Sequence, residues 1–172
     1  LFFDTTSYAS LGTWTDIGNQ ILRAKTDGTP TNNPDDDAVS NFRVNSTGTY
    51  KIWVNSIDYE LDQQGSRFYN VDINGNRLAK TFGQHGATGF VWEDGGTFEL
   101  QKGVLNELRV VDTAAFFGRL NGLIITNDME FTPTTDLASY KDYTVNNASA
   151  TEFVPASFPE WANGDINETQ VE

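Results

Sequence analysis

The side chains best suited to chemistry in this sequence are aromatic and polar groups set in a glycine-rich segment. Trp92 lies in that segment, surrounded by Gly83, Gly86, Gly89, Gly95 and Gly96. A loop of this kind would present a flat ring that stacks on the C–H face of a sugar, with His85 and Asp94 as hydrogen-bond partners at its rim. Two alternatives stay open: Trp92 as a core residue at the start of a strand, and the single histidine, His85, as a solvated loop residue.

Two further segments carry residues of the same chemical kind. Asp58 and Tyr59 follow a predicted strand that contains Trp53, and Phe117 and Arg119 lie where the chain enters the last predicted strand. A guanidinium group binds a carboxylate through two parallel hydrogen bonds, so Arg119 favours an anionic polysaccharide. The alternatives are a surface tyrosine that covers a loop, and an arginine held in a structural salt bridge.

The acidic run from Asp35 to Asp37 is the densest group of oxygen ligands in the chain. Calcium takes about six to eight oxygen ligands, so the run is a candidate calcium site through Asp35 and Asp37. The alternating ligands and central glycine of an EF-hand loop are missing. A solvated acidic loop is therefore the alternative interpretation.

The composition excludes several classes of function. The chain has no cysteine, which rules out a disulfide scaffold, a zinc–thiolate site and a cysteine nucleophile. The chain has one histidine, and its 24 acidic residues make chance carboxylate pairs certain. Neither feature identifies a catalytic residue, so none is assigned. The net charge of −13 argues against binding to nucleic acid or to anionic membranes. No apolar run approaches the roughly 20 residues of a membrane-spanning helix.

Short alternating segments predict the elements that position these side chains. The segment 49–55 places Tyr50, Ile52 and Val54 on one side, which is the period of a strand with one buried face. The segment 67–73 repeats the pattern and runs into Asn74-Gly75, a pair typical of a tight hairpin. The sequence therefore predicts an all-β, antiparallel jelly-roll β-sandwich without an amphipathic helix. Its predicted core comprises Tyr50, Ile52, Val54, Tyr69, Val71, Ile73, Phe98, Leu100, Leu108, Val110 and Ile124.

The segment 90–100 is predicted as two strands, 90–92 and 97–100, separated by Gly95 and Gly96. The sandwich is expected to span residues 1–131. Residues 132–172 are expected to form a linker and a C-terminal extension, which either packs on the sandwich or leads to a neighbouring domain. Trp53 faces away from the apolar side of its strand, and we expect this extension to cover it rather than leave it as a second binding platform.

From Gly48 onward the sequence resembles non-catalytic carbohydrate-binding modules with a galactose-binding-like jelly roll, such as families 6 and 35. The resemblance covers about half of the chain and rests on these segments: 48–54 (GTYKIWV), 65–68 (GSRF), 71–75 (VDING), 82–83 (FG), 92–96 (WEDGG), 101–103 (QKG), 111–112 (VD), 117–119 (FGR) and 123–126 (LIIT).

The resemblance implies a structural calcium ion held near the first and last strands. A first-strand glutamate and an aspartate at the start of the last strand are usual there, and Asp4 and Asn121 occupy those places. It also implies a polysaccharide partner, a catalytic domain in the same parent chain, and a secreted, bacterial, monomeric module. A first residue other than Met favours a piece of a longer protein.

Three functions are weighed. The leading hypothesis is carbohydrate binding that targets an attached polysaccharide-degrading domain to its substrate. The rival is a structural or interdomain module that packs its aromatic side chains against a neighbour and binds no sugar. A small polysaccharide lyase or hydrolase comes third.

Overall fold

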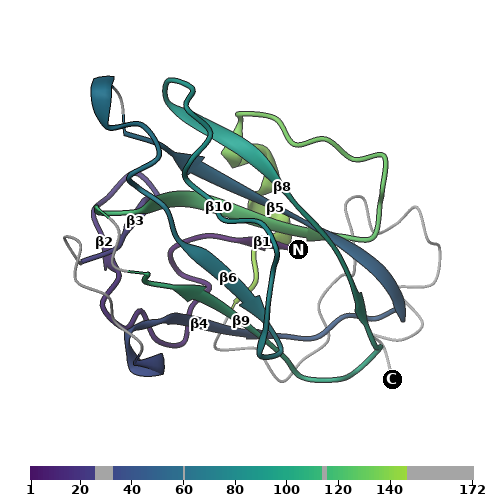
Figure 1. The fold of residues 1–172 in the computed structure, drawn as a ribbon. Helices are drawn as coiled ribbons and strands as arrows, with labels where there is room; N and C mark the ends of the chain where they lie inside the picture. The colour runs from purple at the N-terminus through teal and green to yellow at the C-terminus, as the bar shows by residue number, and fades with distance from the viewer. Residues whose placement is uncertain (26–32, 60, 114–115, 147–172) are drawn as a thin grey trace.

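The computed structural model describes residues 1–25, 33–59, 61–113 and 116–146, and within them the chain folds into two antiparallel sheets (Figure 1). The larger sheet has the order β2 (Thr15–Asp16), β3 (Leu22–Arg23), β10 (Arg119–Thr126), β5 (Gly48–Ile57) and β8 (Phe90–Leu100), with β1 (Phe2–Phe3) also paired to β10. The smaller sheet has the order β4 (Ala38–Phe42), β9 (Asn106–Val111), β6 (Asn70–Ile73) and β7 (Asn76–Arg77). Three short 3₁₀ helices accompany them: η1 (Pro34–Asp36), η2 (Leu61–Gln63) and η3 (Leu137–Tyr143). The predicted antiparallel β-sandwich is confirmed.

The core between the sheets follows the period of two along β5. Tyr50, Ile52 and Val54 are fully buried, while Lys51 and Trp53 lie on the other face. Burial of each large apolar side chain stabilises the fold by about 1.5–3 kcal/mol. Most of the predicted core residues are buried as expected, but Phe98 is only partly buried, and Ile124 is buried outside the sandwich, on the outer face of the larger sheet.

The predicted hairpin at Asn74-Gly75 is confirmed. Both residues have positive φ, 51° and 78°, and they join β6 to β7 with Ile73 opposite Asn76. Positive φ at both central positions matches the right-handed twist of the flanking strands. An Asn-Gly pair is well suited to this conformation, since Gly has no Cβ and Asn tolerates the left-handed region.

Trp92 does not lie in the predicted loop, because Gly83, Gly86 and Gly89 precede the strand β8, whereas Gly95 and Gly96 lie within it. Instead, β8 runs without interruption from Phe90 to Leu100 and pairs with β5 along its length, with a register shift opposite Ile52. Gly95 is a packing requirement, because a Cβ there would lie 2.6 Å from Ile52 Cγ2 and 2.9 Å from Phe82 Cζ. Its small size lets the strand cross the core closely, and Trp92 and Asp94 consequently lie within a strand.

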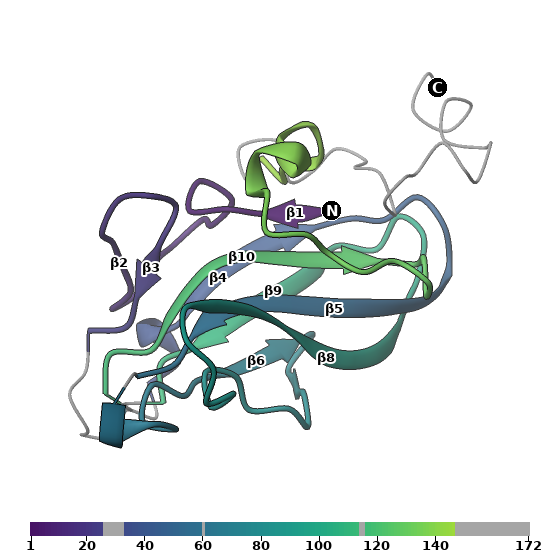
Figure 2. The ribbon, with the colours of Figure 1, turned by 90° about the horizontal axis from the view of Figure 1, so that it is seen from above.

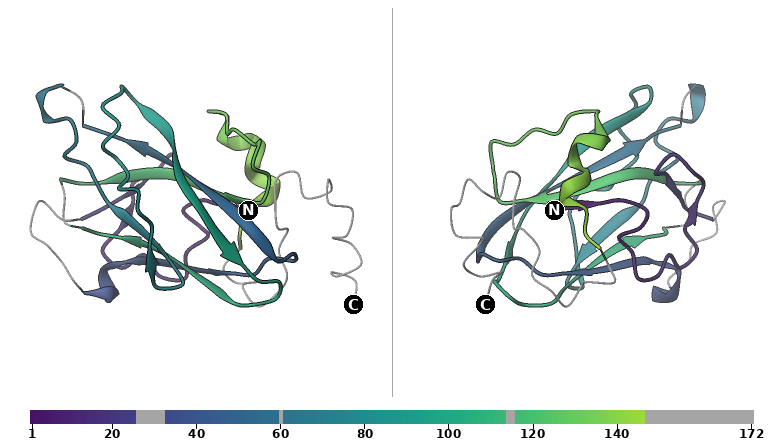
Figure 3. Two further views of the ribbon diagram at one scale, coloured as in Figure 1. Left: turned by 45° about the vertical axis from the view of Figure 1, so that its right-hand side comes forward. Right: turned by 180° about the vertical axis from the view of Figure 1, so that it is seen from behind.

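The segment that follows β10 packs on the outer face of the larger sheet. Figure 2 and Figure 3 show η3 lying over β1 and β10, on the side away from the smaller sheet. Phe2, Ile124 and Tyr140 form a buried cluster there, which we call the outer-face cluster, with Trp53, Trp92, Phe131, Leu137 and Tyr143 packed against it. The Val145 N–H donates to Phe2 O at 2.8 Å and ties the segment to β1.

The expected extension therefore lies on the sandwich as far as the structure describes it. Trp53 is covered on its own sheet face, in line with the expectation from its position on β5. Residues 147–172, the remainder of the predicted extension, lie outside the described residues. In the described part of the chain, no helix is long and apolar enough to cross a membrane.

Candidate functional site

Asp58 organises the loops at the end of the sandwich where β5 ends and β8 and β10 begin. Its carboxylate accepts hydrogen bonds from the backbone N–H groups of Tyr59 (2.7 Å), Gly65 (2.8 Å) and Gly86 (2.9 Å). The residue is only 1% exposed. Asp58 was expected to contact a ligand, but the structure places it beneath the loops, where it positions their backbones.

His85 joins the same loop region through both ring nitrogens. Its Nε2 lies 2.9 Å from Ser56 O, and its Nδ1 lies 3.1 Å from the Ala87 N–H. The neutral tautomer with the proton on Nε2 satisfies both contacts, since Nε2 then donates to a carbonyl and Nδ1 accepts from an amide. The imidazole thus fixes the turn at residues 85–87, next to the loop that Asp58 holds.

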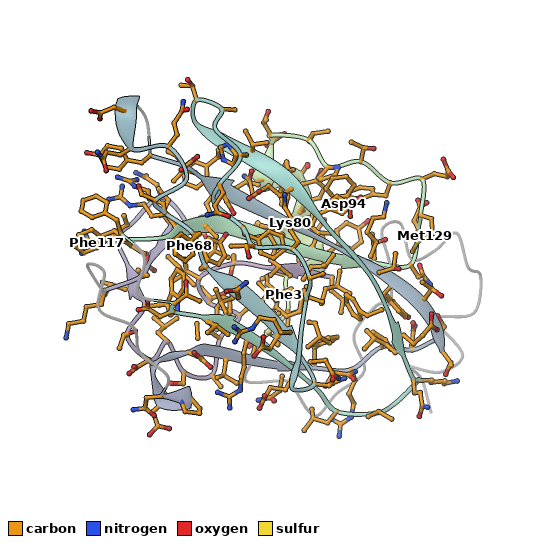
Figure 4. The ribbon with its side chains drawn as sticks, in the orientation of Figure 1. Phe3, Phe68, Lys80, Asp94, Phe117 and Met129 are labelled. Carbon is orange, nitrogen blue, oxygen red and sulfur yellow. The ribbon has the colours of Figure 1, made fainter. Side chains whose placement is uncertain are left out.

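Three aromatic side chains gather at this end, and we call them the loop-end aromatics: Tyr59, Phe116 and Phe117. The ring centroids of Tyr59 and Phe116 lie 5.4 Å apart, and those of Phe116 and Phe117 lie 5.0 Å apart, both in edge-to-face arrangements. Phe116 is 41% exposed, and Figure 4 shows Phe117 at the left edge of the molecule. Phe117 also has a φ of +51°, an uncommon and strained conformation for a bulky residue.

Three arginines surround these rings: Arg23, Arg67 and Arg119, here called the arginine cluster. Arg23 lies directly opposite Arg119 in the β3–β10 pair, so both side chains project from the same face of the sheet. The Arg23 guanidinium carbon lies 5.4 Å from the centroid of the Phe117 ring, and that of Arg67 lies 4.7 Å from the centroid of Tyr59. Each of these distances is within range of a cation–π contact.

The arginine cluster concentrates positive charge in a strongly acidic chain. Burial lowers the pKa of the Arg119 guanidinium, and the positive charges of Arg67 and Arg23 lower it further. The Nε atoms of Arg23 and Arg119 are buried without a hydrogen-bond partner, and neither residue forms an ion pair within the described chain. Arg77 and Arg109, by contrast, pair with acidic side chains.

The sequence pointed to Tyr59 and to the segment 116–119, which contains Phe117 and Arg119, and it missed Arg23 and Arg67. Arg23 is separated from Arg119 by 95 intervening residues, and only the pairing of β3 with β10 brings the two together. A usable signal was present in Phe116-Phe117-Gly118-Arg119, where two adjacent aromatic residues precede an arginine at the start of a strand.

Trp92 and Asp94 lie in β8 apart from the loop-end aromatics, and the C-terminal segment packs against Trp92. Trp92 Nε1 donates to Thr134 O at 2.9 Å, and its ring meets Tyr140 edge to face at 6.3 Å. Asp94 forms an ion pair with Lys51 at 3.3 Å and is well separated from Phe117 in Figure 4. The structure therefore does not bring these two residues together with Tyr59, Phe117 and Arg119.

The residues expected to hold calcium each have partners within the chain. Asp4 Oδ1 accepts hydrogen bonds from the N–H and hydroxyl groups of Thr6, and Asn121 Oδ1 accepts from Asn55 Nδ2 at 2.6 Å. Asp37 is buried and forms an ion pair with Arg109 at 3.3 Å.

Asp35 lies in η1, where its backbone N–H donates to Asn33. Within the described residues, no group of three or more acidic or histidine side chains converges. The described residues thus offer no cluster of three carboxylates, and a calcium ion here would depend on carbonyl oxygens as well.

A groove of about 410 Å³ opens elsewhere, between the edge strands β7 and β8. Its lining residues are Ile73, Asn74, Asn76, Arg77, Leu78, Ala79, Gly95, Gly96, Thr97, Phe98 and Glu99. None of the predicted site residues lies there. The candidate site is instead the surface formed by the loop-end aromatics and the arginine cluster.

No family model matches this sequence, and no curated protein matches it. Its fold, however, is similar to solved carbohydrate-binding modules. A family 35 module from Clostridium thermocellum superimposes with a TM-score of 0.53 at 16% identity, over 73% of this chain and 97% of that one. A mannan-binding module from Man5C gives a TM-score of 0.51 at 16% identity, over 73% and 96% of the two chains.

The chain also matches part of a much larger enzyme. A GH26-CBM35 β-(1,4)-mannanase of Podospora anserina gives a TM-score of 0.55 at 16% identity, over 77% of this chain and 28% of that one. This chain therefore spans less than a third of the mannanase. Together these similarities establish the fold as the jelly roll of family 35 carbohydrate-binding modules.

Proposed function

We propose that this chain is a non-catalytic carbohydrate-binding module that holds an attached polysaccharide-degrading domain on its substrate. The observation that carries the proposal is the gathering of three aromatic and three arginine side chains at one end of a sandwich of this fold. The similarity to a mannan-binding module and to a GH26-CBM35 mannanase supports both the class of ligand and the attachment to a catalytic domain.

The loop-end aromatics supply the surface for stacking. Phe116 is the most exposed of the three rings, and Tyr59 and Phe117 support it edge to face from two sides. A ring already held by its neighbours loses little conformational entropy when a sugar stacks on it. Asp58 and His85 hold the loops near these rings through hydrogen bonds, so the surface is ordered before a ligand binds.

The arginine cluster makes the proposed ligand anionic. Arg23 and Arg119 have no acidic partner in the described chain, although acidic residues outnumber basic ones by 24 to 11. A negatively charged polysaccharide would provide the counter-charge that the protein does not supply. Since such polymers lie outside cells, the proposal includes a secreted parent protein.

The rival interdomain function finds less support on the outer face of the larger sheet. The outer-face aromatics Trp53 and Trp92 pack against the segment of the same chain around Tyr140, which leaves them unavailable to a neighbouring domain. Catalysis is not part of the proposal. The release of reducing ends or of unsaturated products from the same polysaccharides would contradict its non-catalytic part.

Affinity electrophoresis against a panel of neutral and anionic polysaccharides tests the proposal. We expect the parent chain to be retarded by at least one anionic polysaccharide. Phe116→Ala should weaken that retardation about tenfold, because one exposed ring supplies a large share of a small contact. Leu105→Ala is the matched control, since Leu105 is 49% exposed in the loop between β8 and β9 at the opposite end of β8. Retardation by none of the polysaccharides would overturn the proposal.

A further inference from the structure

The arginine cluster assembles three guanidinium groups from three separate parts of the chain. Arg23 comes from β3, Arg67 from the segment between η2 and β6, and Arg119 from the first position of β10. We infer that this cluster recognises a tetrahedral ester anion, a sulfate or phosphate monoester carried by a glycan. The inference rests on the proposed function and specifies the charged group that the same site binds.

The number of guanidinium groups distinguishes a tetrahedral anion from a carboxylate. A carboxylate is planar and has two oxygens, which one guanidinium fork satisfies in a bidentate contact. A sulfate or phosphate monoester presents three terminal oxygens in different directions, and each can accept hydrogen bonds from a different arginine. Arg23 and Arg119, paired across two strands, supply two guanidinium forks where a single carboxylate needs only one, and Arg67 adds a third positive charge nearby.

The backbone geometry brings at least two of these groups to the same point. Arg23 and Arg119 are paired residues on adjacent antiparallel strands, with Cβ atoms about 5 Å apart in such a pair. Both Arg67 and Arg23 are close enough to Arg119 for their charges to affect its titration. Two like charges across a strand pair repel each other, so the arrangement is costly without an anion between them.

The aromatic rings orient two of the guanidinium planes. Arg23 lies over the Phe117 ring and Arg67 over the Tyr59 ring. A guanidinium that stacks on a ring projects its N–H groups outward in its own plane, towards a ligand beside the ring. The sugar would then lie on the exposed ring of Phe116, with its ester group directed to the arginines.

The test compares one polymer backbone carrying different charged groups. The parent chain is titrated with dextran and with carboxymethyl-dextran, dextran sulfate and dextran phosphate of equal substitution. Chondroitin sulfate and its desulfated form, which keeps its uronates, are titrated alongside. We expect tighter binding of the sulfated or phosphorylated polymer than of the carboxymethyl form by about tenfold or more, since each lost charge-assisted hydrogen bond weakens binding by about that factor. The separate sulfate and phosphate arms identify which ester is preferred.

Variants at the cluster separate geometry from charge. Arg23→Lys and Arg119→Lys keep the charge but lose the planar fork, and each should weaken binding to the ester-bearing polymer about tenfold. Arg77→Ala is the control for net charge, because Arg77 lies on β7, away from the site, and pairs with Asp72. It should bind like the parent. Thermal melts of all variants establish that they are folded.

Three outcomes would overturn the inference. The first is equal affinity for the carboxymethyl and the ester-bearing polymers. The second is parental affinity in the folded variants Arg23→Lys and Arg119→Lys. The third is a loss of affinity in Arg77→Ala as large as in these two variants, which would indicate non-specific attraction. If the parent binds only uronate-bearing polysaccharides, the proposed function stands and this inference fails. If it binds only neutral polysaccharides, carbohydrate binding stands, but the anionic ligand and this inference both fail. Binding to no polysaccharide at all refutes both.

Discussion

Replacement of Trp92 by alanine should destabilise the domain while leaving the loop-end site able to bind. A fully buried tryptophan contributes about 3–5 kcal/mol relative to alanine. Trp92 is only partly buried, so about half of that contribution applies. With the loss of the Nε1 hydrogen bond to Thr134 O, the free energy of unfolding should fall by about 2–3 kcal/mol. For a domain of this size, that corresponds to a decrease in melting temperature of about 4–12 °C.

Thermal and urea denaturation of Trp92→Ala, Trp92→Phe and Phe116→Ala would test this reasoning. Trp92→Phe keeps an aromatic ring against Tyr140 but loses the hydrogen bond, so it should lose only about 1 kcal/mol. Phe116→Ala removes an exposed ring and should melt like the parent while binding polysaccharide more weakly. The opposite pattern, in which Trp92→Ala melts normally but no longer binds, would refute the assignment and restore Trp92 as the sugar platform that its sequence context predicted.

Three further predictions concern the carboxylates. Asp58→Ala should lower the free energy of unfolding by about 2–3 kcal/mol, because three backbone N–H groups lose their acceptor. It should also weaken polysaccharide binding, and a parental melt would contradict its positioning role. Millimolar calcium and a chelator should give the same melting temperature, since Asp4 and Asn121 already bond within the chain; a rise with calcium would indicate a site outside the described donors.

Burial raises the pKa of Asp37 above its ordinary 3.8, partly offset by its hydrogen bond and ion pair with Arg109. The folded state therefore favours the protonated acid, and stability from this group is lost as the pH rises from 3.8 through the raised pKa. Relative to Asp37→Asn, the parent should thus lose stability over that interval in urea denaturation, and a parallel pH dependence would contradict the shift.

Local sequence patterns determined the central strands of this protein. Alternation along residues 49–55 specified β5 and its buried face, and Asn74-Gly75 specified a hairpin whose backbone few other residue pairs adopt. The two-residue strand β2 was not predicted, because two residues carry no period. Gly95 and Gly96 predict a loop from sequence alone, which does not show that Ile52 and Phe82 approach Gly95 too closely for a side chain.

The candidate site was only partly accessible from sequence, for the same reason. The types of side chain in 116–119 and at Tyr59 indicated a ligand surface, since aromatic and cationic groups in loops are chemically suited to sugars. Tertiary pairing decided the rest: the register of β3 against β10 placed Arg23 beside Arg119, and η3 covered Trp92. Residue type is a local property, whereas which side chains share a surface depends on strand pairing and packing between segments distant in the chain, and these exist only in the folded molecule.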